Sequence, residues 1–371
     1  MTPGSKKTES ARLIALDAFR GFTIAAMILV NYPGSWHHVY PPLLHVEWHG
    51  ITPTDLIFPF FIFIVGVSIV LAYNKRLDAG HPKNEMYQKI VTRSVKIFAV
   101  GIFLALFPLF NFENIRVAGV LQRIALVFAA CAFLYLNTDW KTQAWTGAVI
   151  LIAYWLAMTL IPTPGAGKPM LEPGVNLAAW IDQQLLPGRM WQGNWDPEGI
   201  LSTFPAIVTG ITGMLAGKLI VSGKSRERTV IWLFCIGFIC TVAGEMWGWV
   251  FPINKNIWTS SYVLYTSGLA AMTLATAMFI IDMLDYRRGA RFGIIYGANA
   301  ITAYVLAGVL SGLFYSIPYW GGDSLNHHFV GGLSGMGLEP KLASLMFALI
   351  YVFIIYVPVY FLYRKKIFIK L

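Results

Sequence analysis

Long apolar segments recur from one end of the chain to the other, and they constrain its fold more than any other feature. They fall at residues 13–32, 54–74, 93–110, 117–136, 144–161, 199–220, 229–250, 258–282, 292–315 and 341–362. A helix needs about 20 apolar residues to cross the roughly 30 Å of bilayer hydrocarbon, and each segment is close to that length. Only 12% of the 371 residues are charged, about half the share of a soluble domain. We therefore predict an all-α, polytopic integral membrane protein of about ten transmembrane helices, with residues 1–371 forming a single domain.

The distribution of Lys and Arg between the connecting segments predicts the orientation. About 21 of them lie in one alternating set of segments and about 5 in the other, and basic residues stay on the cytoplasmic side of short loops. Both termini are therefore expected in the cytoplasm. The first segment carries Asp17 and Arg20 and has no clear cleavage site, so we expect a retained helix and not a signal peptide. The net charge of +10 then reflects topology, and no nucleic-acid partner is predicted.

Two charged residues in the first segment point to a binding site. Asp17 and Arg20 are three residues apart and can pair on a helix, and Gly21 leaves room beside the guanidinium. This arrangement suits an anion that approaches from the cytoplasm, although a simple ion pair at the helix end is the alternative. Asn31 returns to nearly the same face about 16 Å further along the axis. A long anionic ligand could follow that stripe, or Asn31 could simply end the helix before a proline.

The segment after the first span is rich in acid–base groups. Residues 33–53 contain four of the seven histidines and no Lys or Arg. His45 could act as a base oriented by Glu47 or by Asp55, since histidine titrates near neutral pH, or it could briefly carry an acyl group itself. A metal site formed by the histidines lacks regular ligand spacing, so no metal is predicted. Thr54 is expected to cap the second span.

Other polar and aromatic residues fall in the same half of the predicted bundle. Arg123 and Glu245 lie within spans, where a charge usually marks a site, and with Asn254 and Lys255 they could surround one pocket. They could equally satisfy each other or backbone carbonyls. Tryptophan is concentrated on this side as well, which fits either sugar stacking or an interfacial aromatic belt.

Several motifs in order along the chain are similar to a known family. They are Leu16-Asp-Ala-Phe-Arg-Gly21, Val30-Asn-Tyr32, His45-x-x-Trp48-x-Gly-Ile-Thr-x-x-Asp55, Gly119-Val-Leu-Gln-Arg123, Asp196-Pro-Glu-Gly-Ile-Leu-Ser202 and Asn254-Lys-Asn-Ile-Trp258. Together they resemble the heparan-α-glucosaminide N-acetyltransferase family of the transmembrane acyltransferase superfamily, in its bacterial amino-sugar branch. The loop between Asn31 and His45 is slightly longer than the animal pattern, and we expect no counterpart of the large amino-terminal luminal region. A heparan polymer is therefore not the expected substrate.

The resemblance implies an acetyltransferase that takes acetyl-CoA from the cytoplasmic side and acetylates the amine of a glucosamine-type sugar on the other side. It also implies a bacterial inner membrane and a homodimer. The residues predicted as catalytic are Asn31, His45 and Asp55; those predicted to bind acetyl-CoA are Asp17, Arg20, Gly21, Gln122 and Arg123; those predicted to bind the sugar are Glu47, Trp48, Glu198, Glu245, Asn254, Lys255 and Trp258. The alternative is a secondary transporter of sugars or other small polar solutes, although no internal repeat supports it.

Overall fold

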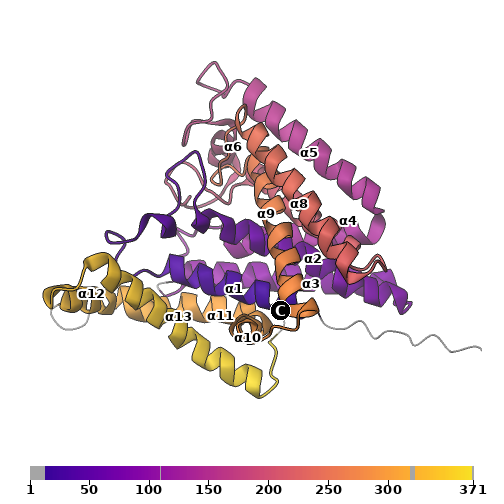
Figure 1. Ribbon diagram of the computed structural model, residues 1–371. Coiled ribbons are helices and arrows are strands. Elements are labelled where there is room, and N and C mark those ends of the chain that lie inside the picture. Colours follow the sequence, from indigo (N-terminus) through magenta and orange to yellow (C-terminus); the bar gives the residue numbers. More distant parts are fainter. Residues whose placement is uncertain (1–12, 109, 318–321, 370–371) are drawn as a thin grey trace, which may run out of the picture.

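The computed structural model describes residues 13–108, 110–317 and 322–369, and within them the chain is almost entirely helical (Figure 1). Eight helices or helix pairs of this described part are long and apolar enough to cross a membrane. They are α1 (Ile14–Asn31), η2 with α2 (Pro53–Leu56 and Ile57–Asp78), α4 (Val120–Asn137), α5 (Trp140–Leu160), α7 (Ile200–Ile220), α8 (Arg226–Gly248), α9 with η3 (Ser260–Ala277 and Met278–Met283) and α13 (Pro340–Arg364). The prediction of an all-α polytopic membrane protein is confirmed.

Two of the ten predicted spans differ from the structure. Residues 93–110 correspond to α3 (Lys83–Leu106), a long helix that is not among the eight. Even the part of α3 from residue 89 to its end contains three basic residues, Lys89, Arg93 and Lys96. Residues 292–315 form a broken element, in which α10 (Ala290–Ala298) meets α11 and η4 (Ala300–Ser311 and Gly312–Ser316) at an angle of 80°. Apolar composition shows that a segment can enter lipid, but it does not show where the segment bends.

The connecting segments divide the molecule into two ends. The loop end, as we call it, is formed by residues 32–52, 110–119, 161–199 and 249–259. The first of these segments contains η1 (Pro41–Leu43), and the third contains α6 (Leu177–Leu185). The short helix α12 (Leu325–Gly335) precedes α13 at the same end. In Figure 1 these loops lie at the upper left. The opposite end, called the basic end, carries Arg76, Lys141, Lys218, Arg226 and Arg364. The uneven distribution of Lys and Arg is therefore a feature of the folded bundle as well as of the sequence.

Close helix packing fixes the position of α1, which carries the first polar motif. A Cβ added to Gly21 would lie 1.7 Å from the carbonyl oxygen of Gly293 on α10, so only glycine fits at this crossing. Small residues allow such backbone approach in membrane helices. We expected Gly21 to leave room beside a guanidinium, whereas the structure places it against the backbone of α10.

Candidate active site

A histidine–carboxylate pair lies at the loop end, where α1, η2 and the 33–52 loop meet. Nδ1 of His45 is 2.7 Å from Oδ1 of Asp55. The Asp55 side chain is only 1% exposed, while that of His45 is 47% exposed. Of the two carboxylates that the sequence offered to His45, the structure selects Asp55; Glu47 is exposed. The pair combines a buried anion with an accessible imidazole.

Local sequence holds Asp55 in place. Thr52, and not Thr54 as expected, caps η2 in a reciprocal capping box with Asp55. Oδ2 of Asp55 accepts hydrogen bonds from the Thr52 amide (3.0 Å), the Thr52 hydroxyl (2.9 Å) and the Val46 amide (3.1 Å). The Tyr262 hydroxyl on α9 donates to the Asp55 backbone carbonyl at 2.6 Å. Oδ1 is therefore left to orient His45.

Lys255 reaches the same pair from the turn between α8 and α9. Its Nζ atom is 3.0 Å from Nδ1 and 3.1 Å from Nε2 of His45, and 3.7 Å from Oδ1 of Asp55. Burial lowers the pKa of Lys255, and the negative charges of Asp55 and Glu198 partly offset that effect. A cation, an anion and an imidazole are thus in mutual contact.

The turn that carries Lys255 is organised by its own polar residues. Asn254 is fully buried, accepts from the Ile257 amide at 3.1 Å and donates to Nδ1 of His49 at 3.2 Å. Burial lowers the pKa of His49, which agrees with a neutral ring that accepts this bond. Trp48 donates to the Leu171 carbonyl at 3.0 Å. Asn254 and Trp48 therefore join the loops that surround His45.

Arg123, on the first turn of α4, is 1% exposed and contacts the segment that follows Lys255. Its Nη2 donates to the Gly199 carbonyl at 3.1 Å and to the Ser202 hydroxyl, and its guanidinium lies 5.1 Å from the centre of the Trp258 ring. Trp258 is also 1% exposed, so it supports the site from below and does not offer a face to a sugar. Nε and Nη1 of Arg123 have no hydrogen-bond partner among the described residues.

A second ionic cluster joins the loop before α4 to the loop before α7. Arg116 donates to both carboxylate oxygens of Asp196, at 2.8 and 2.7 Å, and also to Glu198. Burial opposes the charge of Arg116, but the two carboxylates raise its pKa. Asp182 of α6 lies near this cluster, and burial raises the pKa of its carboxyl group to about 6. Its Oδ1 atom accepts a hydrogen bond from the Ile200 amide at the start of α7. These contacts fix Glu198 near Lys255 and Arg123.

Other predicted residues lie elsewhere in the structure. Arg20 is held by Ser68 at 2.9 Å and by Gly297 and Asp17 at 3.4 Å, so it joins α1 to α2 and α10. Gln122 is buried against Gly101 of α3.

Two further predicted site residues are exposed and lie apart from the His45 and Arg123 contacts described above. Asn31 is exposed at the end of α1, and no hydrogen bond to His45 is present in the part of the chain described. Glu245 is exposed on α8 and is not brought to the Arg123 cluster.

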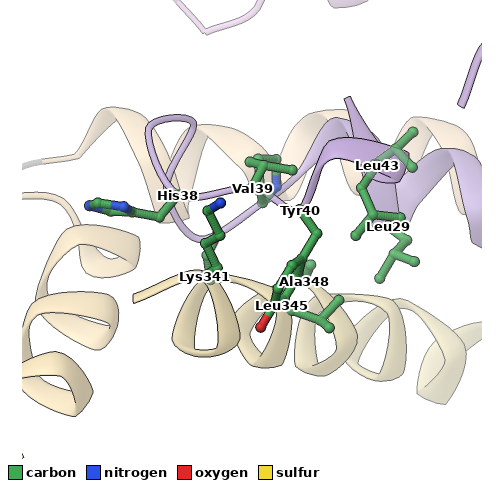
Figure 2. Close-up of a pocket in the computed structure, with 11 residues that line it drawn as sticks. Leu29, His38, Val39, Tyr40, Leu43, Lys341, Leu345 and Ala348 are labelled. Carbon is green, nitrogen blue, oxygen red and sulfur yellow. The ribbon is translucent and has the colours of Figure 1, made fainter. Parts of the chain in front are cut away.

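The small crevice shown in Figure 2 is separate from this cluster. It lies between the end of α1, residues 38–43 and the start of α13, and His38 and Lys341 contribute to its lining. Its volume is about 10 Å³, enough for about one water molecule. Neither His45 nor Lys255 lines it. A sugar or a nucleotide does not fit there.

The chemistry that this arrangement supports is proton transfer beside an ordered carboxylate. When Oδ1 of Asp55 accepts a hydrogen bond from the Nδ1–H group of His45, the lone pair of Nε2 is available as a base. Among the described residues no group of three or more His, Cys, Asp or Glu side chains is placed to hold a metal ion.

Sequence reasoning missed Arg116 and Thr52 and assigned Lys255 only to substrate. Arg116 and Lys255 belong to the few basic residues on the sparse side of the Lys/Arg distribution, and these exceptions were the available signal.

Comparison with known proteins agrees with the motifs of this site. The sequence-family model for the catalytic region of heparan-α-glucosaminide N-acetyltransferase matches residues 12–232, more than half of the chain. Heparan-α-glucosaminide N-acetyltransferases of Mus musculus and Homo sapiens are 28% and 29% identical to the chain, over 100% and 97% of its length. The chain spans 62% and 60% of the length of these two relatives. The matched region includes His45, Asp55, Arg123 and Glu198, and the chain therefore belongs to the family defined by this catalytic region.

Proposed function

We propose that this protein is a transmembrane acetyltransferase, which takes acetyl-CoA from the cytoplasmic side and acetylates the amine of a glucosamine-type sugar at the loop end. The observation that carries the proposal is the exposed His45 imidazole ordered by the buried Asp55 carboxylate, within the region matched by the family. Acetyl-CoA is too large and too charged to cross hydrocarbon unaided. The bundle therefore has to bring the acetyl group to the loop end.

The proposed reaction is direct transfer. The amine nitrogen attacks the thioester carbonyl carbon, the carbon–sulfur bond breaks, and CoA leaves as the thiol. Nε2 of His45 accepts the proton from the amine and returns it to the departing sulfur. Asn31 donates a hydrogen bond to the developing oxyanion, a role that rests on the family motif. Arg20 helps to hold the phosphates of CoA at the inner part of α1.

The surroundings of the protein follow from the same proposal. We assign it to a bacterial inner membrane, with both termini cytoplasmic and a homodimer as the assembly. Glu47 and Glu198 are the proposed acceptor-binding carboxylates at the loop end, because an amino sugar carries positive charge when protonated. Glu198 is already positioned by Arg116.

Incubation of the purified protein with acetyl-CoA and a panel of amino sugars tests the function. We expect acetylated sugar and free CoA by mass spectrometry, and no product from His45→Ala, which should still bind CoA. Reconstitution in vesicles adds sidedness, with acetyl-CoA required on the side of the basic end. Accumulation of unmodified sugar in the vesicles, without free CoA, would identify a transporter and refute the enzyme.

A further inference from the structure

The position of Lys255 relative to the His45 ring has a consequence for proton transfer. Nζ is nearly equidistant from the two ring nitrogens, at 3.0 and 3.1 Å. In the plane of the imidazole the Cε1 atom occupies the space between those nitrogens, so an equidistant cation lies over the ring face. The in-plane lone pair of Nε2 therefore stays open. With a side chain 47% exposed, His45 can be reached by an acceptor while Lys255 remains in contact with it.

The charges on the two sides of the ring oppose each other. Asp55 at 2.7 Å favours a second proton on the imidazole, because an imidazolium beside a carboxylate is an ion pair. A doubly protonated ring cannot accept a proton from an amine. The ammonium of Lys255 disfavours that second proton, since two positive charges then lie about 3 Å apart.

We propose that Lys255 is a positioning residue, which offsets the charge of Asp55 and keeps His45 in the neutral form that acts as a base. This inference rests on the proposed acetyl transfer and adds to it a residue that sets its pH range. Arginine at this position would preserve the charge, whereas methionine would preserve only the length of the side chain.

Other charged groups around Lys255 do not replace it. Glu198 faces it from the segment before α7 and Arg123 from α4, but Glu198 is paired with Arg116, and Arg123 is held by Gly199 and Ser202. His49 lies beside the turn and contacts Asn254. Within the described ranges, Asp55 and Lys255 are thus the charged groups in direct contact with the His45 ring.

The pH dependence of kcat/KM in Lys255→Met and Lys255→Arg tests the proposal. In Lys255→Met the acid limb of the profile should move to higher pH by about one unit, because the cation is removed. In Lys255→Arg the acid limb should stay where it is in the unsubstituted protein, because the positive charge is kept. Lys341→Met, also at the loop end, is the matched control and should leave the limb in place. An unmoved acid limb in Lys255→Met would overturn the proposal. If that variant does not fold, Lys255→Gln provides the same measurement.

A second measurement does not depend on turnover. Diethylpyrocarbonate modifies neutral imidazole, so its rate at His45, followed by peptide mass, reports the protonation of that ring. At about pH 6 we expect slower modification in Lys255→Met than in the unsubstituted protein. If no acetylated sugar forms but this difference is present, the proposed function fails and the effect of Lys255 stands. If product forms and the modification rates are equal, the role of Lys255 is refuted.

Discussion

Replacing Asp55 by Asn should prevent His45 from acting as a base, although the loop should remain folded. The substitution preserves shape but exchanges one carboxylate oxygen for an NH2 group. With its amide oxygen at the Oδ2 position, Asn still accepts from Val46 and Thr52. The NH2 group then faces Nδ1 of His45, which must become an acceptor. The ring proton moves to Nε2, and the lone pair that the proposed reaction uses as a base is lost.

The size of each effect follows from these contacts. The bonds from Val46 and Thr52 are retained, and the contact with His45 changes from a charge-assisted to a neutral hydrogen bond. The free energy of unfolding should therefore fall by no more than one charge-assisted bond, about 1.5–3 kcal/mol. The wrong tautomer costs roughly 10⁴ in kcat in serine hydrolases, where an aspartate orients a histidine in the same way. We expect a loss of about 10³ to 10⁴ here, or roughly 4 to 5.5 kcal/mol in the barrier.

The assay is the rate of acetylated-sugar formation under single-turnover conditions, together with Tm in detergent. Asp323→Asn is the matched control, because Asp323 also pairs with a histidine, His327 at 3.0 Å, but both side chains are exposed. It should retain full activity. A loss of less than about tenfold in Asp55→Asn, in a variant that folds, would show that Asp55 does not orient a catalytic base.

Three further predictions concern packing, pH and the acyl donor. Gly21→Ala forces a Cβ against the Gly293 carbonyl and should lower Tm, whereas Gly331→Ala, with nothing within 4 Å, should not; equal Tm values would contradict the packing. Because the pKa of Asp182 rises from 3.8 to about 6 on folding, its neutral form stabilises the fold at low pH. That contribution is lost as pH rises from 3.8 to about 6. The Tm of the unsubstituted protein relative to that of Asp182→Asn should therefore fall between these two pH values, and a constant difference would refute the argument. Arg20→Ala should weaken acetyl-CoA binding at least about tenfold in calorimetry, and an unchanged Kd would leave Arg20 as a structural link between helices.

Local sequence was sufficient to predict the His45–Asp55 pair but not its surroundings. His45 and Asp55 are ten residues apart, and the capping of η2 brings the carboxylate back towards the preceding loop. Trp258 and Asn254 were expected at the substrate, yet both are buried. A motif indicates that a residue matters, but it does not distinguish a residue that contacts the ligand from one that supports the site.

The sequence by itself determined that this chain forms membrane-spanning helices with one side rich in Lys and Arg and the other side poor in them. Backbone groups in hydrocarbon must bond within their own helix, so apolar length alone implies helices, and Lys and Arg mark one side. Only the tertiary structure decided that Lys255, 210 residues after His45, lies on its imidazole ring, and that the segment around Asn299 bends by 80°. Such contacts depend on how helices distant in sequence pack together, and no local pattern contains that information.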